Sequence, residues 1–121
     1  MAKHENRHHE INYIEFAVRD LSEAKRFYGD AFGWKFTDYG DAYVGIQHPY
    51  TDGECGGMHQ AEEVSDGGPL VILYSEALEQ SLASVQQAGG DVTAEIFSFP
   101  GGRRFHFADP SGNQLAVWSD K

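Results

Sequence analysis

Cysteine is almost absent from this sequence, since Cys55 is the single one in 121 residues. An intrachain disulfide is therefore excluded, and a reduced, cytoplasmic setting is the natural expectation. The sequence also lacks any apolar run near the ~20 residues that a membrane-spanning helix needs. Residues 1–10 are charged and have no apolar stretch of the kind that marks a secretory signal. No membrane partner is expected.

Basic residues are few as well: nine Lys and Arg stand against 19 Asp and Glu, which gives a formal net charge of −10. A protein that binds nucleic acid needs a basic face to meet the phosphates, so no nucleic-acid partner is predicted. The ordinary interpretation of this acidity is solubility. The sharper interpretation is a preference for cationic or neutral ligands.

The hydrophobic pattern occurs twice, because residues 12–34 and 70–92 both read as strand, cap, amphipathic helix, glycine and new strand. Asp20 and Ser75 are the expected caps of helices at about 21–32 and 76–88. Residues 61–69 are the expected linker, and residues 4–10, with three histidines, are expected to form a frayed tail or a weak metal site. The predicted strands are Ile11–Val18, Trp34–Thr37, Ala42–His48, Cys55–Gln60, Leu70–Tyr74, Val92–Phe99, Arg103–Ala108 and Gln114–Ser119.

The sequence thus predicts an α+β fold in one domain, residues 1–121, built from two βαβββ modules at about 11–60 and 69–119. Each helix must bury its apolar stripe on one face of a sheet, which leaves the other face to curve around a ligand. The two modules are expected to form a cleft between them.

Alternation along two strands selects the polar residues expected in that cleft. Glu15 alternates with the apolar residues of the first strand, and Arg104 and His106 alternate with two phenylalanines. We predict that these three side chains lie together on one concave face. Glu15 and His106 then form either an acid–base pair or, with Arg104, a structural ion-pair network. A third alternative is an atypical metal site of Glu15, His59 and His106, although no paired ligand spacing supports it.

Aromatic residues suggest the walls of the same cleft. Tyr13, Tyr43, Tyr74 and Trp118 fit a planar or cationic ligand, and the alternative for each is core packing or a subunit interface.

Several segments together resemble the vicinal oxygen chelate superfamily, the group of glyoxalase I, bleomycin-resistance proteins, fosfomycin-resistance proteins and extradiol dioxygenases. The resemblance implies paired βαβββ modules that form a U-shaped cleft, a mixed sheet, and usually a homodimer. The segments that carry it are Val18–Asp20 leading into Phe27-Tyr28, Phe32–Trp34, Gln87–Gly90 and Phe105–Asn113.

The same resemblance places metal ligands of the metal-dependent members on the inner faces of four strands. By spacing, three of those positions fall on Tyr13, Leu70 and Ala116. Leucine and alanine cannot bind a metal, and a neutral tyrosine is a poor ligand. The resemblance therefore implies the fold without the usual metal site, and we predict no metal and no cofactor there.

Two functions follow. In the first, the protein binds a small aromatic or cationic molecule in the cleft, as the bleomycin-resistance branch does, through Tyr13, His59, Tyr74, Arg104 and Trp118. In the second, it is a lyase, isomerase or dioxygenase-like enzyme acting on a small oxygen-bearing substrate. Glu15 is then the general base, while Arg104 and His106 stabilise a developing oxyanion. The sequence favours the binding protein and leaves the enzyme as the alternative.

Overall fold

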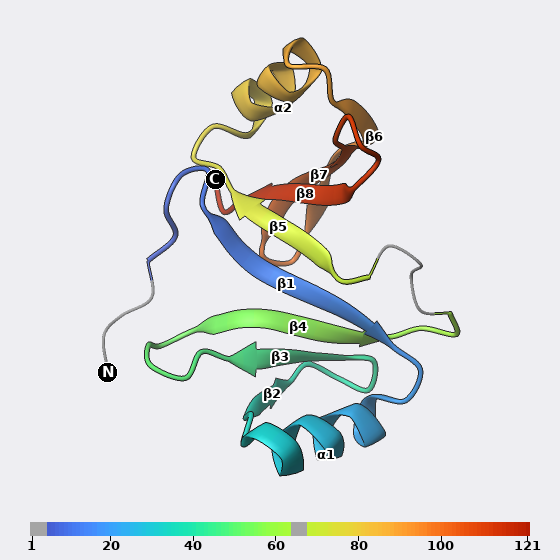
Figure 1. Cartoon of the computed structure of the whole chain (residues 1–121). Helices are drawn as coiled ribbons and strands as arrows, with labels where there is room; N and C mark the ends of the chain where they lie inside the picture. Colours follow the sequence, from blue (N-terminus) through green and yellow to red (C-terminus); the bar gives the residue numbers. More distant parts are fainter. Residues whose placement is uncertain (1–4, 64–67) are drawn as a thin grey trace. The chain divides into compact units, whose positions relative to one another are not determined.

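The computed structural model describes residues 5–63 and 68–121. The chain is divided into two compact units, one mainly of Tyr13–Pro69 and one of Asn6–Asn12 with Leu70–Lys121. Each unit holds four of the strands and one helix, as Figure 1 shows along the chain. The elements are β1 (Ile11–Val18), α1 (Leu21–Phe32), β2 (Phe36–Asp38), β3 (Tyr43–Gln47), β4 (Glu54–Gln60), β5 (Leu70–Tyr74), α2 (Leu78–Gln87), β6 (Asp91–Phe99), β7 (Gly102–Ala108) and β8 (Gln114–Ser119).

The two units share one strand order. In the first unit the strands lie in the order β2-β3-β4-β1, and in the second unit the equivalent order is β6-β7-β8-β5. The pairs β1–β4 and β5–β8 are parallel, whereas β2–β3, β3–β4, β6–β7 and β7–β8 are antiparallel. The predicted α+β class and the repeated strand–helix–three-strand sequence are confirmed.

Helix α1 begins and ends as its sequence predicts. The Asp20 carboxylate accepts a hydrogen bond from the Glu23 backbone N–H at 3.0 Å, which satisfies one of the unpaired amides of the first turn. Gly33 ends the helix with φ of 72°, a left-handed conformation that favours glycine, and its N–H bonds the carbonyl of Gly29.

Helix α2 begins later than the predicted residue 76, because Ser75 is not its N-cap. The helix starts at Leu78 with Ala77 as the N-cap residue. The Ser75 hydroxyl instead accepts from the Ala77 backbone N–H at 3.0 Å and lies 2.7 Å from the Ser81 hydroxyl. The hydroxyl therefore closes the turn before the helix.

The predicted strand at 34–37 begins two residues too early. Trp34 stacks on Tyr28 of α1, with ring centroids 4.6 Å apart and ring planes 10° apart. This contact keeps the chain against the helix, so β2 starts only at Phe36. The other strand ends are within one residue of the prediction.

The N-terminal segment is not frayed at residues 8–10, so the prediction of a frayed tail was wrong there. The His9 backbone N–H donates to the Tyr74 carbonyl at 2.7 Å, and the Tyr74 N–H donates to the Glu10 carbonyl at 3.2 Å. The Glu76 N–H donates to Nδ1 of His8 at 2.9 Å. Backbone hydrogen bonds to β5 hold this polar segment, and such bonds leave no hydrophobic pattern in the sequence. His4 and residues 64–67 of the expected linker lie outside the described residues.

Each helix buries its apolar stripe on one face of its own sheet. Leu21 of α1 packs with residues of β3 and β4, and Leu78 of α2 packs with residues of β7 and β8. We call the opposite sheet face the helix-free face of each unit. Among the described helices, neither has the length and apolarity needed to cross a membrane. The buried residues of the two core clusters are Val44, Ile46 and Met58 with Leu21, and Phe105 and Val117 with Leu78.

Candidate functional site

The helix-free face of the first unit is built over two glycines. Register places Glu15 beside Gly57, and Gly57 beside Gly45. A Cβ on Gly57 would lie 2.1 Å from the Tyr43 hydroxyl and 2.5 Å from the Tyr13 hydroxyl. Contacts this short do not occur, so the missing side chain leaves the space in which the two hydroxyls meet.

Those hydroxyls and Glu15 form a hydrogen-bonded chain. The Tyr43 hydroxyl donates to Oε2 of Glu15 at 3.1 Å, and the Tyr13 and Tyr43 oxygens are 2.5 Å apart. Because a phenol has one proton, Tyr43 can serve Glu15 only if Tyr13 donates to Tyr43. Nδ1 of His59 lies 4.0 Å from Oε1 of Glu15. The structure thus brings together four residues that the sequence predicted for the cleft: Tyr13, Glu15, Tyr43 and His59.

Burial and neighbouring charge keep both phenols protonated at neutral pH. Burial raises the pKa of Tyr13 to about 12; the hydrogen bond with Tyr43 lowers this pKa, and the Glu54 and Glu15 charges raise it by smaller amounts. Burial, the bond with Tyr13 and the Glu15 charge raise the pKa of Tyr43 well above its usual range. Tyr43 therefore acts as a hydrogen-bond donor to Glu15.

A second carboxylate on this face was missed by sequence reasoning. The register shift between Ile46 and Gln47 places Gln47 opposite Glu54 and skips Cys55. The Glu54 carboxylate consequently lies over Gly45, where an added Cβ would meet its Oε2 at 2.1 Å. It accepts a hydrogen bond from the Tyr39 hydroxyl at 2.5 Å. Strict alternation cannot place Glu54, because the bulge reverses the face of the residues before it.

The helix-free face of the second unit holds the other predicted residues. Register places Tyr74 beside Trp118, and Trp118 beside Arg104, while His106 lies beside Ala116. The Tyr74 and Trp118 rings meet edge to face, with centroids 5.2 Å apart. Phe105 and Phe107 pack toward α2, as the alternation predicts.

Two phenylalanines that the sequence analysis gave no role surround Arg104. The Arg104 guanidinium carbon lies 5.4 Å from the ring centroid of Phe97 and 5.6 Å from that of Phe99. The Phe97 ring also lies 5.6 Å from the His106 ring. Counting back through the turn at residues 100–101 would have paired Phe97 with Arg104. Register shifts earlier in β6, however, break the alternation from which the face of Phe97 could be predicted.

The raised pKa of Tyr74 predicts a pH dependence of stability that can be measured. Its side chain is 2% exposed, and burial together with a hydrogen bond to the Asp120 carboxylate raises its pKa from 10.0 to about 12. The folded state therefore keeps this proton after the unfolded chain has lost it, so stability falls as pH rises through that window. Tyr74→Phe should remove up to ~2.7 kcal/mol of this alkaline loss. Urea unfolding at a series of pH values measures it, with the exposed Tyr50→Phe as control, and an unchanged pH slope in Tyr74→Phe would contradict it.

The predicted site residues are divided between the units. Tyr13, Glu15 and His59 belong to the first unit, and the second contains Tyr74, Arg104, His106 and Trp118. The predicted cluster of Glu15 with Arg104 and His106 has members in both units, and it stays a prediction. The described residues contain no group of three or more His, Cys, Asp and Glu side chains that could hold a metal.

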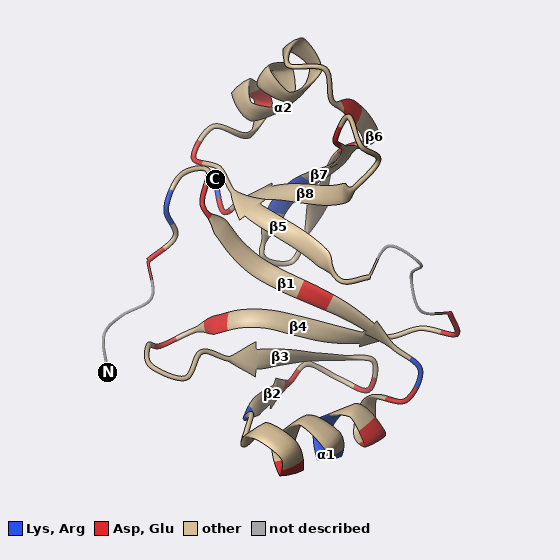
Figure 2. Cartoon of the chain, in the orientation of Figure 1, with Lys and Arg blue, Asp and Glu red and all other residues tan. Residues whose placement is uncertain are grey.

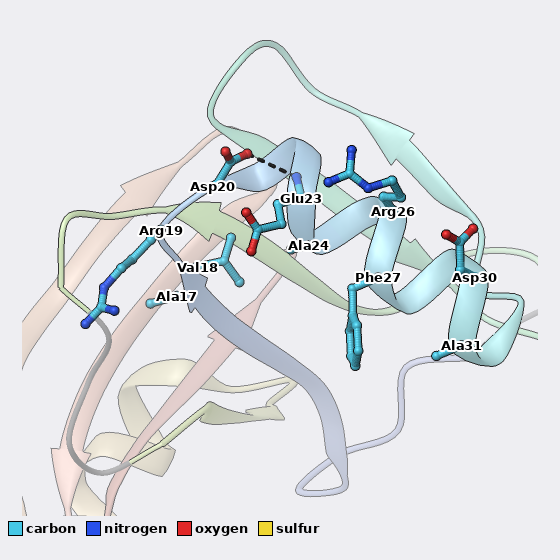
Figure 3. Close-up of a pocket in the computed structure, with 10 residues that line it drawn as sticks. All are labelled: Ala17, Val18, Arg19, Asp20, Glu23, Ala24, Arg26, Phe27, Asp30 and Ala31. Atoms are coloured by element: carbon cyan, nitrogen blue, oxygen red, sulfur yellow. Dashed lines mark hydrogen bonds between the residues drawn. The ribbon is translucent and has the colours of Figure 1, made fainter.

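A separate hollow lies beside α1 in the first unit, and Figure 3 shows its lining along one side of the helix and the end of β1. Its charged groups have both signs, with Arg19 and Arg26 near Asp20 and Asp30. None of the predicted site residues is among those that line it. This hollow therefore gives no support to the predicted cleft chemistry.

Comparison with known proteins finds relatives over nearly the whole chain. A glyoxylase-like domain-containing protein of Didymella fabae is 26% identical, covering 91% of this chain and 93% of that protein. The Mn(II)-bound glyoxalase of Novosphingobium aromaticivorans is 25% identical with a TM-score of 0.73, covering 96% of this chain and 40% of that one.

A glyoxalase/bleomycin resistance protein/dioxygenase superfamily member of Vibrio splendidus 12B01 has the same fold, with 15% identity and a TM-score of 0.71. The alignment covers 92% of this chain and 98% of that one. The family model of the Glyoxalase/Bleomycin resistance protein/Dioxygenase superfamily matches residues 10–117. The chain belongs to this superfamily.

Proposed function

We propose that this protein binds a small molecule with an aromatic surface in a U-shaped cleft lined by the helix-free faces of its two units. The observation that supports the proposal is the difference between the two faces of the strands in each unit. One face packs under a helix, and the other presents rings, with Tyr13 and Tyr43 in the first unit and Tyr74 and Trp118 in the second. Rings with a few polar groups are the usual lining of small-molecule sites.

The metal site expected of metal-dependent relatives does not fit these residues. Leu70 and Ala116 have no donor atom in their side chains. The Tyr13 hydroxyl already bonds Tyr43, and its raised pKa opposes the phenolate that a metal would require. We therefore assign no step of the function to a metal at these positions.

A ligand screen tests the proposal. We expect an aromatic compound to raise the melting temperature of the protein, since a ligand at a hundred times its dissociation constant adds ~2.7 kcal/mol of stability. The panel contains cationic aromatic drugs, aromatic carboxylates, α-ketoaldehydes with thiols, and divalent metals. Trp118→Phe should weaken the response, and Trp34→Phe is the matched control because Trp34 packs on the helix side of the first unit. A panel without any hit, or a hit insensitive to Trp118, would contradict the proposal.

A second candidate function is favoured by the surroundings of Glu15. One carboxylate oxygen accepts from Tyr43, and the other lies 4.0 Å from His59. A carboxylate held this way can accept a proton from a small oxygen-bearing substrate as a general base, as in a lyase or isomerase. Glu15→Gln separates the two functions, because an enzyme would lose turnover while keeping affinity, whereas a binding protein has no turnover to lose.

We also propose that the protein is cytoplasmic, which its single cysteine favours, and that it forms a homodimer, as the family resemblance implies. Light scattering at micromolar concentration should give twice the chain mass of 13.4 kDa. A monomer at that concentration would contradict the dimer.

A further inference from the structure

The adjacent residues Arg103 and Arg104 occupy opposite faces of β7 and have different surroundings. Arg103 donates from its two terminal nitrogens to the Glu79 carboxylate of α2, at 2.5 and 3.2 Å, and from Nε to the Lys121 carbonyl at 3.2 Å. Its donors thus link the strand to α2 and to the C-terminal residue. Arg104 lies on the helix-free face, beside Phe97 and Phe99.

The Arg104 guanidinium packs against two aromatic rings, which restricts its side-chain motion. Its central carbon is less than 6 Å from both phenylalanine ring centroids, within the range of a cation–π interaction. Guanidinium is flat and weakly hydrated, so rings can pack on its faces while the N–H donors point outward along its edge. A cation fixed in this way loses little further side-chain freedom when it binds an anion.

Arg104 is a cationic group beside aromatic ring surface. Strands β5, β7 and β8 contain no Asp or Glu, whereas β6, which pairs with β7, contains Asp91 and Glu95. Figure 2 shows the basic segment on β7, where no acidic segment is drawn. Phe97 is 40% exposed, and the Phe99 ring centroid is 6.2 Å from that of Trp118.

We propose that Arg104 binds the carboxylate of a planar aromatic or conjugated ligand, whose flat body packs on Phe97, Phe99 and Trp118. This inference rests on the proposed small-molecule binding and names the class of the ligand. The guanidinium fork matches the two oxygens of a carboxylate in a pair of parallel hydrogen bonds. The neighbouring rings favour a flat group attached to that carboxylate, which a free inorganic anion lacks.

Cinnamate and cinnamamide test the proposal, because they share a planar body and differ in the charged end. Calorimetric titration at neutral pH should show that the wild-type protein binds cinnamate at least ~10-fold more tightly than cinnamamide. In Arg104→Gln this difference should vanish. In Arg103→Gln it should persist, because Arg103 lies on the other face and bonds Glu79.

Arg104→Lys keeps the charge without the flat fork, so it should retain only part of the preference for cinnamate. Circular dichroism and the melting temperature establish that each variant is folded; if Arg104→Gln does not fold, Arg104→Lys and Phe97→Leu replace it, and both should weaken cinnamate binding. Equal binding of acid and amide, no cinnamate binding, or an unchanged preference without Arg104 would overturn the inference. The proposed function would survive any of these results if another aromatic ligand still bound in a Trp118-dependent manner.

Discussion

Phe105→Ala is expected to lower the free energy of unfolding by ~3–5 kcal/mol. Phe105 is 0% exposed, and it packs with Leu78 of α2 and Val117 of β8 in the core of the second unit. Removing the ring takes away buried apolar surface and leaves a cavity that the helix and sheet can close only in part. Phe105 is the largest of the fully buried side chains in this core cluster.

Urea unfolding followed by circular dichroism measures the change. Phe97→Ala is the matched control, because it deletes the same ring from the opposite face of the second unit, where 40% of the side chain is exposed. We expect the control to lose ~1 kcal/mol, mostly from its contact with Arg104. Equal losses in the two variants would show that the helix side is not the main core of this unit.

Gly56→Ala should be at least as damaging to the first unit, with a loss of ~3 kcal/mol or more. A Cβ on Gly56 would lie 2.3 Å from the backbone oxygen of Ile14, its partner in the parallel β1–β4 pair. Backbone cannot turn aside as a side chain can, so the methyl group must push the two strands apart. Because these two strands carry Glu15 and His59, the two side chains would also move apart.

Gly45→Ala supplies the comparison. Its Cβ would also collide, at 2.1 Å, but with the end of the flexible Glu54 side chain. We expect Gly45→Ala to shift Glu54 and to cost clearly less stability than Gly56→Ala in the same urea experiment. If Gly45→Ala proved the more damaging of the two, the closeness of β1 and β4 at Gly56 would be in doubt.

The sequence is sufficient to predict regular elements where the local chemistry is explicit. Asp20 and Gly33 delimit α1 because a cap and a left-handed glycine are properties of a few neighbouring residues. Alternation correctly separates Phe105 from Arg104, because the pairing of β7 with β8 is regular over its whole length.

Prediction fails where the chain departs from regular spacing. Glu54 and Phe97 were missed because bulges in β3–β4 and β6–β7 change which face a residue occupies, and no residue type marks such a bulge. The Tyr13–Tyr43–Glu15 chain was found only in part, since it depends on the space above Gly57. That space is a tertiary property with no local signal.

The attachment of residues 6–12 to the second unit makes the order of synthesis matter. The Trp118 indole donates to the Asn12 side chain across 106 residues, and His9 reaches Ser81 across 72. Closing such long loops is slow and entropically costly. A ribosome releases this N-terminal segment first, yet its partners emerge only after the whole first unit has been made. The second unit can therefore fold only after translation of its own strands, when residues 6–12 at last find their partners. A bulky N-terminal fusion should delay the folding of the second unit more than that of the first.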